Sequence, residues 1–394
     1  MTILSLADTR FPIERANGLQ TMSTCHALAE RGHVVRLLVR PDTSRPARDP
    51  FAFYGVAPND NLRIETVRAA GGARGRRAAF MFAAIRAANT SAADLIYTRD
   101  LGVAALLCRL PSSRRRRLVY ESHGVASIVS DEMPRLLASA APPTDAKRRR
   151  LDERERRVWE TADSYITITS ALSDDLTARY GWRHRVFVVP DGAREPSIAV
   201  VQPSPSDAPV AGYAGHLYPW KGVDIFVEAL AHAPGIRGLI VGGHPGESDR
   251  ARIESLAKEV GVADRLEITG LVPPTDVAAR LAAATMLVLP NTPSVISERY
   301  TSPLKLFEYL WMNRPIVASD LPSIGEVLTH DVSGWLVQAG DARALASAML
   351  HLARDPKRST RLASAARALA PNFTWARRAE RLEAAFTAAL ILDR

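Results

Sequence analysis

The sequence predicts an α/β protein of two doubly wound domains of similar size, and three observations lead to this prediction. Short runs of aliphatic and β-branched residues alternate with helix-length segments, which is typical of parallel sheets covered by helices on both faces. A Pro- and Ser-rich stretch from Glu195 to Pro209 divides the chain near its middle. The length of 394 residues, with 47% hydrophobic and 24% charged residues, is ordinary for a globular protein of two or three domains.

The expected strands follow this alternation in both halves of the chain. In the first half they are residues 3–6, 34–39, 95–97, 118–120, 164–168 and 186–189. In the second half they are residues 212–215, 239–241, 266–268, 286–289, 315–318 and 334–337, with helical periodicity between them. We therefore predict one domain at residues 1–195, a linker at 196–209 and a second domain at 210–374. A last helical run begins at residue 375.

The segment that starts at Ser302 has the features of a helix start that binds an anion. Ser302 is a good N-cap residue, and Pro303 suits the first helical position. The N–H groups of Leu304 and Lys305, together with the positive end of the helix dipole, favour a phosphate at this end.

Glu308 lies on the same helix face as Lys305, about one turn deeper, where a carboxylate suits the paired hydroxyls of a ribose. An ordinary amphipathic helix with a surface Lys and Glu has the same local pattern. The expected strand at residues 286–289 favours the ligand site, because ligands of open α/β sheets bind beyond the carboxyl ends of strands.

A second candidate phosphate site lies at Lys221 and Gly222, where a loop after the expected strand 212–215 meets a helix. The chain has 46 Arg but only five Lys, and two of those five, Lys221 and Lys305, lie at the two candidate sites. A compact ammonium acts as a point charge, whereas a guanidinium is a planar fork. With only five lysines in the chain, chance alone can also explain why two of them lie at the candidate sites.

Taken together, these motifs resemble the retaining glycosyltransferases of the GT-B fold, family 4 (group 1). The resemblance is carried by residues 215–222 (GHLYPWKG), 302–309 (SPLKLFEY) and 314–320 (RPIVASD). It continues upstream through residues 17–18 (NG), 27–29 (ALA), 32–33 (GH), 120–123 (YESH) and 189–192 (VPDG), and so covers nearly the whole chain. It implies two Rossmann-like domains that face each other across a cleft, with the last helix packed back on the N-terminal acceptor domain.

The resemblance also implies roles for individual residues. The C-terminal domain is expected to bind a nucleotide sugar, most often a UDP-sugar, and the donor-binding candidates are Gly18, His216, Lys221, Ser302, Pro303, Leu304, Lys305 and Glu308. The catalytic candidates are His123, Lys221 and Glu308, with His123 contacting the transferred sugar. Arg99, Glu121 and His123 follow expected strands of the first domain and are the acceptor-side candidates.

Two positions depart from the family pattern. Many members have a Glu eight residues before the one that matches Glu308, and this chain has Tyr300 there, with Glu298 two residues out of register. Whether Glu298 or Tyr300 takes the place of that Glu stays open. Many members also have Arg where this chain has His216, which leaves Lys221 as the surer diphosphate contact.

The resemblance implies transfer of a sugar to an acceptor hydroxyl with retention of anomeric configuration. Lysine side chains and the helix start would stabilise the leaving diphosphate, and no metal or other cofactor is expected, because the chain has no Asp-x-Asp pair. The acceptor is expected to be a sugar, a lipid-linked molecule or a small molecule. A nucleotide-sugar epimerase, a sugar phosphorylase and a non-catalytic nucleotide-sugar-binding protein are the alternatives.

The net charge of +9 is confined to the first half of the chain. Residues 1–195 contain 31 Lys and Arg against 22 Asp and Glu, whereas residues 196–394 contain 20 of each. The runs 114–117 and 147–150 supply clusters that would suit an anionic membrane or acceptor, or simply a solvated surface. Nucleic acid is not expected, because these clusters lack interleaved aromatic residues and the usual binding motifs.

The remaining sequence features favour a cytoplasmic protein, with peripheral contact at the inner face of the membrane as a further expectation. The apolar run at the N-terminus meets Asp8 too early for a secretory signal, and no window has the roughly 20 apolar residues of a membrane span. Cys25 and Cys108 lie in apolar helix-like stretches and are expected to be buried free thiols.

Overall fold

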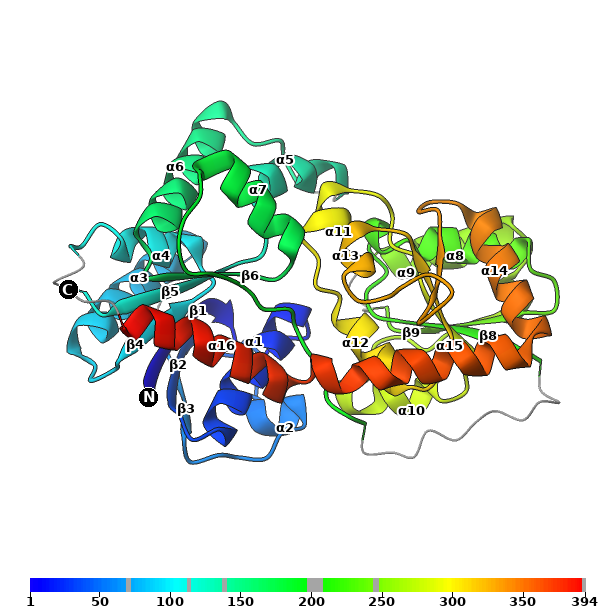
Figure 1. Cartoon of the computed structure of the whole chain (residues 1–394), viewed down its shortest axis with the longest axis horizontal. Coiled ribbons are helices and arrows are strands. Elements are labelled where there is room, and N and C mark those ends of the chain that lie inside the picture. The colour runs from blue at the N-terminus through cyan, green and yellow to red at the C-terminus, as the bar shows by residue number, and fades with distance from the viewer. Residues whose placement is uncertain (69–71, 112–114, 137–139, 197–207, 244–247, 392–394) are drawn as a thin grey trace. The chain divides into compact units, whose positions relative to one another are not determined.

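The computed structural model describes residues 1–68, 72–111, 115–136, 140–196, 208–243 and 248–391, and it shows two α/β units (Figure 1). Unit 1 consists of Met1–Asp131, Pro142–Asp191 and Trp375–Arg394, and unit 2 consists of Glu132–Ala141 and Gly192–Thr374. The chain therefore leaves unit 1 briefly between Asp131 and Pro142, leaves it again after Asp191 and returns to it at Trp375. Most of the predicted linker, residues 197–207, lies outside the described residues.

The described strands of unit 1 form one parallel sheet in the order β3-β2-β1-β4-β5-β6-β7. They are β1 (Thr2–Arg10), β2 (Val34–Arg40), β3 (Leu62–Thr66), β4 (Leu95–Thr98), β5 (Arg117–Ser122), β6 (Ser164–Thr167) and β7 (Val186–Val188). The strand order reverses between β1 and β4, and the carboxyl edge at such a reversal is where open α/β sheets bind ligands.

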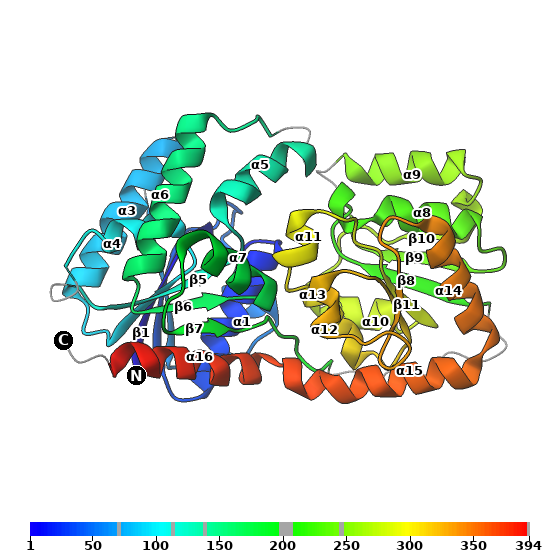
Figure 2. The ribbon, with the colours of Figure 1, turned by 45° about the horizontal axis from the view of Figure 1, so that its top comes forward.

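Helices cover both faces of this sheet. They are α1 (Ala16–Glu30), α2 (Pro50–Tyr54), α3 (Ala73–Thr90), α4 (Leu101–Leu107), α6 (Asp145–Thr161), α7 (Ser170–Tyr180) and α16 (Trp375–Leu390). Helix α5 (Ala126–Leu136) begins in unit 1, and its residues from Glu132 on belong to unit 2. Helix α16 packs against α1, β5 and β6, while α4 packs between α3 and α6 (Figure 2). The C-terminal helix is thus part of unit 1, and its buried residues include Ala379, Leu382 and Phe386.

The described strands of unit 2 also form one parallel sheet, in the order β10-β9-β8-β11-β12-β13. They are β8 (Val210–Ala214), β9 (Arg237–Val241), β10 (Leu266–Ile268), β11 (Met286–Leu289), β12 (Ile316–Ser319) and β13 (Trp335–Val337). The α-helices are α8 (Val223–Ala231), α9 (Asp249–Glu259), α10 (Val277–Leu281), α11 (Val295–Arg299), α12 (Leu304–Trp311), α13 (Pro322–Gly325), α14 (Ala342–Arg354) and α15 (Pro356–Leu369). The 3₁₀ turns are η2 (Pro219–Lys221), η3 (Ala263–Arg265), η4 (Pro274–Asp276) and η5 (Ala370–Phe373).

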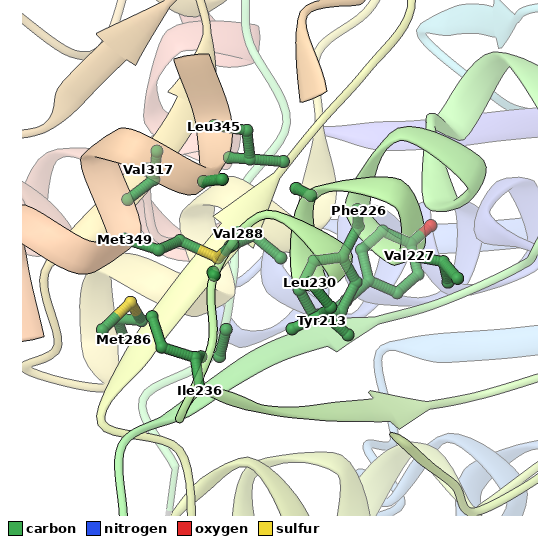
Figure 3. Packing of buried hydrophobic residues seen from close by; sticks show 14 of the residues in the cluster. Tyr213, Phe226, Val227, Leu230, Ile236, Met286, Val288, Val317, Leu345 and Met349 are labelled. Atoms are coloured by element: carbon green, nitrogen blue, oxygen red, sulfur yellow. The ribbon is translucent and has the colours of Figure 1, made fainter. Parts of the chain in front are cut away.

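Alternate residues of the central strand β11 point into different cores, as expected for a sheet with two covered faces. Met286 and Val288 belong to a cluster with residues of α8, α9 and α14, whereas Leu287 and Leu289 belong to a cluster with residues of α12 and α15. Figure 3 shows the first cluster, in which Phe226 of α8 packs near Tyr213 of β8. Two doubly wound parallel sheets were predicted, and the structure has them.

Strand β3 was not expected, because its five residues include the polar Arg63, Glu65 and Thr66 and leave few apolar positions to signal a strand. The run 114–117 is only partly exposed in its described part, where Arg116 is the exposed residue. Arg115 is only 6% exposed and pairs with Asp163, which also pairs with Arg117 at 3.3 Å. Arg114 lies outside the described residues.

Both cysteines are buried free thiols, as predicted. Among the described residues, no helix combines the length and the apolar character that crossing a membrane requires.

The core of unit 2 gives a direct test of the fold. Phe226 is fully buried, so Phe226→Ala should lower the free energy of unfolding by about 3–5 kcal/mol through lost contacts and a residual cavity. Phe82 on α3 is 70% exposed, and Phe82→Ala should change the free energy of unfolding by less than about 0.5 kcal/mol. Urea denaturation followed by circular dichroism measures both. Equal losses for the two variants would contradict the packing described here.

Candidate functional site

Helix α12 begins one residue later than the sequence suggested. Pro303 is the N-cap, with extended backbone angles of φ −81° and ψ 100°, and the first helical residue is Leu304. No side chain caps this end, so the predictions that Ser302 is the N-cap and that Pro303 is the first helical residue were wrong. The extended ψ of Pro303 itself keeps it out of the helix, so the helix starts at Leu304.

The predicted anion-binding end is still present, one residue further along. Leu304 and Lys305 occupy the first two helical positions, where backbone N–H groups have no acceptor within the helix. The Pro303 carbonyl accepts from the Leu306 N–H at 2.8 Å, which closes the first turn. The helix dipole and these N–H groups therefore favour an anion at this end.

The side chain of Lys305 is held by Tyr213 of strand β8. Its Nζ donates to the Tyr213 hydroxyl at 2.6 Å and lies 3.9 Å from the centre of the tyrosine ring. The Tyr213 hydroxyl in turn donates to the backbone carbonyl of His216 at 2.7 Å. Gly215 leaves room for the amine, because a Cβ there would be 3.1 Å from Nζ. Tyr213 was not predicted as a site residue, since a tyrosine in a strand is normally an ordinary core residue.

Lys221 lies at the end of the short 3₁₀ turn η2, next to Gly222. Gly222 has φ +70°, and a Cβ on it would come within 1.6 Å of the Pro290 carbonyl oxygen, so only glycine fits. This close approach places the Lys221 backbone against the end of β11. From α9, Arg252 donates to the Leu217 carbonyl at 2.7 Å and anchors the same loop.

Three ionisable side chains of this region affect one another. Burial lowers the pKa of Lys221 to about 8, and burial together with the charge of Lys221 lowers the pKa of Lys305 well below its ordinary value. Burial raises the pKa of Glu308 to about 7, although the charge of Lys305 opposes this rise. The structure therefore brings Lys221, Lys305 and Glu308 together. Two amines with little water around them form a site that favours an anion.

Aromatic rings extend from this site along the loop after β8. His216 stacks on Tyr218 with ring centres 4.9 Å apart, and Tyr218 stacks on Trp220 at 4.6 Å. His216 occupies the position where many family members have Arg, and its predicted contact with the donor stays a prediction. Tyr300 is only 3% exposed and packs in the interior, and Glu298 lies in the short helix α11. Which of these two residues takes the place of the Glu found in many family members stays open.

The acceptor-side candidates of unit 1 meet at the carboxyl end of β5. Glu121 is fully buried, and its carboxylate accepts from His123 Nε2 at 2.6 Å and from Gln20 Nε2 at 2.7 Å. Arg99 donates to His123 Nδ1 at 3.1 Å. Both ring nitrogens of His123 therefore have protein partners, although its side chain is 25% exposed.

Gly18, a donor-binding candidate, lies in the first turn of α1. A Cβ on Gly18 would be 2.3 Å from the Tyr54 hydroxyl and 2.8 Å from the Ile13 carbonyl oxygen, so tight packing already explains the glycine. Its expected approach to a diphosphate stays a prediction. Within the described residues, no group of three His, Cys, Asp or Glu side chains is arranged to hold a metal ion.

Comparison with known families agrees with this geometry. Residues 18–192 match the model for the glycosyl transferase 4-like domain, and residues 208–355 match the model for glycosyl transferases group 1. The chain belongs to the group 1 glycosyltransferases of family 4. The resemblance seen in the sequence is thereby confirmed.

Curated relatives include D-inositol 3-phosphate glycosyltransferases. The protein of Xylanimonas cellulosilytica is 30% identical over 56% of this chain and 56% of its own length. That of Nocardia farcinica is 28% identical over 69% of this chain and 61% of its own length. The chain thus matches less than two thirds of the length of either relative.

Solved structures confirm the GT-B fold class. Sucrose-phosphate synthase of Thermosynechococcus elongatus superposes with a TM-score of 0.77 at 21% identity, covering 98% of both chains. HepE of Anabaena in complex with UDP-glucose superposes with a TM-score of 0.74 at 19% identity, covering 98% of this glycosyltransferase family member and 100% of HepE.

The raised pKa of Glu308 predicts a specific pH dependence of stability. The folded protein holds the Glu308 proton up to about pH 7, whereas the unfolded chain loses it near the ordinary value of 4.5. The free energy of unfolding should therefore fall between these two pH values, and Glu308→Gln should remove that part of the fall. Urea titrations at pH 4.5, 6 and 7.5 compare the two proteins. Parallel pH profiles would show that the pKa of Glu308 is not raised in the folded protein.

Proposed function

We propose that this protein is a glycosyltransferase that moves a sugar from a nucleotide-sugar donor to an acceptor hydroxyl. The observation that carries the proposal is the placement of two amines in one region, Lys305 in the first turn of α12 and Lys221 at the end of η2, each with a pKa lowered by burial. Family membership supports the same conclusion. Both lysines and the helix dipole would stabilise the negative charge that develops on the leaving diphosphate.

UDP is our first choice of nucleotide. HepE, which shares the fold, was crystallised with UDP and with UDP-glucose. Glu308 lies on α12 one turn beyond Lys305, where its carboxylate can accept hydrogen bonds from ribose hydroxyls. A protonated Glu308 would be a poorer acceptor, so ionisation of Glu308 near pH 7 favours donor binding, whereas loss of the Lys221 and Lys305 protons as the pH rises disfavours it.

The proposed chemistry uses charged side chains and backbone dipoles in place of a metal ion. Retention of configuration is proposed from family membership, with the leaving phosphate helping to deprotonate the acceptor on the same face of the sugar. His123 is proposed to lie near the transferred sugar, held by Glu121 and Arg99. Addition of EDTA to the assay should leave the rate unchanged, and the anomeric configuration of the product can be determined by NMR.

The acceptor assay should begin with D-inositol 3-phosphate, because relatives of the chain are named for it. Sugar and lipid-linked acceptors complete the panel. Release of nucleoside diphosphate that depends on an acceptor supports a transferase. Conversion of the donor alone would indicate an epimerase, use of inorganic phosphate as the acceptor would indicate a phosphorylase, and donor binding without turnover would indicate a non-catalytic binding protein.

Lys221→Ala should lower kcat/KM on the order of 100-fold or more, because removal of a preorganised charge at a leaving group typically costs this much. Lys258→Ala is the matched control, since Lys258 lies on the exposed face of α9 in the same unit. Acceptor-dependent release of nucleoside diphosphate is the measurement. Unchanged kinetics in Lys221→Ala, or an equal loss in Lys258→Ala, would remove Lys221 from its proposed role.

Contact with an anionic membrane remains a proposal, carried here by the second of the two basic runs, residues 147–150. Lys147, Arg149 and Arg150 are exposed at the start of α6, and α3 presents the exposed Phe82 on a helix without acidic residues. Sedimentation with vesicles of anionic lipid should be strong, and replacing the three α6 cations with Gln should weaken it. Equal sedimentation with neutral vesicles, or of the variant, would contradict this contact.

A further inference from the structure

Arg378 of helix α16 is a buried cation of unit 1 to which sequence analysis gave no role. Its residue exposure is 1%. Its Nη1 donates to the carbonyls of Val189 at 2.9 Å and Pro190 at 3.0 Å, the segment just before the chain leaves unit 1. Its Nη2 donates to Glu121 Oε2 at 2.6 Å. The guanidinium thus connects the C-terminal helix to the carboxylate that holds His123.

The Glu121 carboxylate is the centre of this network. One oxygen, Oε1, accepts from His123 and Gln20, while the other, Oε2, accepts from Arg378 and from the Tyr97 hydroxyl. Burial alone would raise the pKa of Glu121, but the charge of Arg378 and the hydrogen bond from His123 outweigh burial and lower this pKa. Glu121 is therefore an ionised carboxylate with all its acceptor sites in use.

The same contacts settle the protonation of the His123 ring. A guanidinium can only donate, so the contact from Arg99 makes Nδ1 an acceptor without a proton. The proton of the neutral ring must then be on Nε2, which donates to Glu121. Burial and the charge of Arg99 lower the pKa of His123, in agreement with a neutral ring.

The charges around the ring are balanced. Glu121 of β5 and Asp191 after β7 are the carboxylates that face it, and Arg99 after β4 and Arg378 of α16 are the guanidiniums. Burial raises the pKa of Asp191, whose carboxylate lies 3.4 Å from Arg378. Loss of Arg378 would leave an uncompensated negative charge in a buried cluster, and such a cluster tends to take up a proton.

We infer that Arg378 is a positioning residue for His123, which acts through Glu121 to keep the imidazole neutral and in a single tautomer and orientation. This inference rests on the proposed function in so far as His123 lies near the transferred sugar. It gives the C-terminal helix a part in the site, beyond its packing against α1. Arg378 itself is too deeply buried to contact a substrate.

The test measures the pKa of His123 directly, by NMR of protein labelled with ¹³C at histidine Cε1. The His123 signal is assigned as the one absent from His123→Gln. In Arg378→Met we expect the His123 pKa to rise, because the imidazolium form then compensates Glu121. In Arg378→Lys, which keeps the charge, the pKa should stay near that of the wild type. Arg377→Met is the matched control, since Arg377 precedes Arg378 on α16 and pairs with Glu380.

Kinetics give a second readout that a purely structural role would not change. The acid limb of the pH–rate profile should move to higher pH in Arg378→Met, with kcat reduced about tenfold or more and the KM for the donor little changed. In the double variant Arg378→Met/Glu121→Gln the charges are balanced again, and the acid limb should return toward that of the wild type.

An unchanged His123 pKa in a folded Arg378→Met would overturn the inference, as would uptake of the proton by Asp191 in place of His123. If Arg378→Met does not fold, the thermal stability of the double variant decides the question. A double variant that is stable where the single one is not supports the charge pairing. A double variant no more stable than the single one means that Arg378 acts by packing alone. The NMR titration needs no turnover, so a wild-type protein without transferase activity would refute the proposed function and leave the His123 result intact.

Discussion

Loss of water around two like-charged amines is the constraint on which the C-terminal site depends. Lys221 and Lys305 come from different loop and helix ends, yet each has a lowered pKa, and the charge of Lys221 contributes to the lowering at Lys305. Such an arrangement is unfavourable in the free protein. It becomes favourable when an anion lies between the amines, and the start of α12 adds backbone N–H groups on the same side.

The surrounding structure serves to maintain this arrangement. Gly222 allows the loop to touch the Pro290 carbonyl, and Gly215 leaves room for the Lys305 amine beside Tyr213. The charged cluster of unit 1, at the carboxyl edge of its own sheet, differs in that its charges are balanced. There, two carboxylates and two guanidiniums balance one another around the neutral His123 ring. The lysine pair of unit 2 therefore favours the binding of an anion, whereas the groups around His123 in unit 1 have no net charge.

Sequence patterns predicted the two sheets because alternating strands and helices follow from local hydrophobic order. They also predicted that Lys305 and Glu308 share a helix face and that Lys221 lies at a second candidate phosphate site after a parallel strand, and the family resemblance joined the two sites. The predicted start of α12 was one residue too early, because a proline is compatible both with the N-cap position and with the first helical position. The pairing of Arg115 with Asp163 was also missed, because the two residues are 48 positions apart.

The contacts of Tyr213 and Arg378 were beyond sequence reasoning for the same physical reason. Tyr213 and Lys305 are 92 positions apart, and Arg378 and Glu121 are 257 positions apart. Nothing in the local pattern distinguishes a strand tyrosine that holds an amine from one that fills a core. Similarly, an arginine on an amphipathic C-terminal helix is normally a surface residue, and its burial is visible only once the helix is placed on β5 and β6.

Proton uptake on ligand binding tests the central claim most directly. Titration calorimetry of UDP binding at pH 8, in buffers of different ionisation enthalpy, counts the protons that the complex gains. A terminal phosphate with a second pKa near 6 is almost fully ionised at that pH, so the ligand contributes little. If the diphosphate lies between the two amines, it raises their pKa values, and UDP should bind with net proton uptake that falls markedly in Lys305→Met. Binding without proton uptake, or uptake that is the same in Lys305→Met, would contradict a diphosphate site at these lysines.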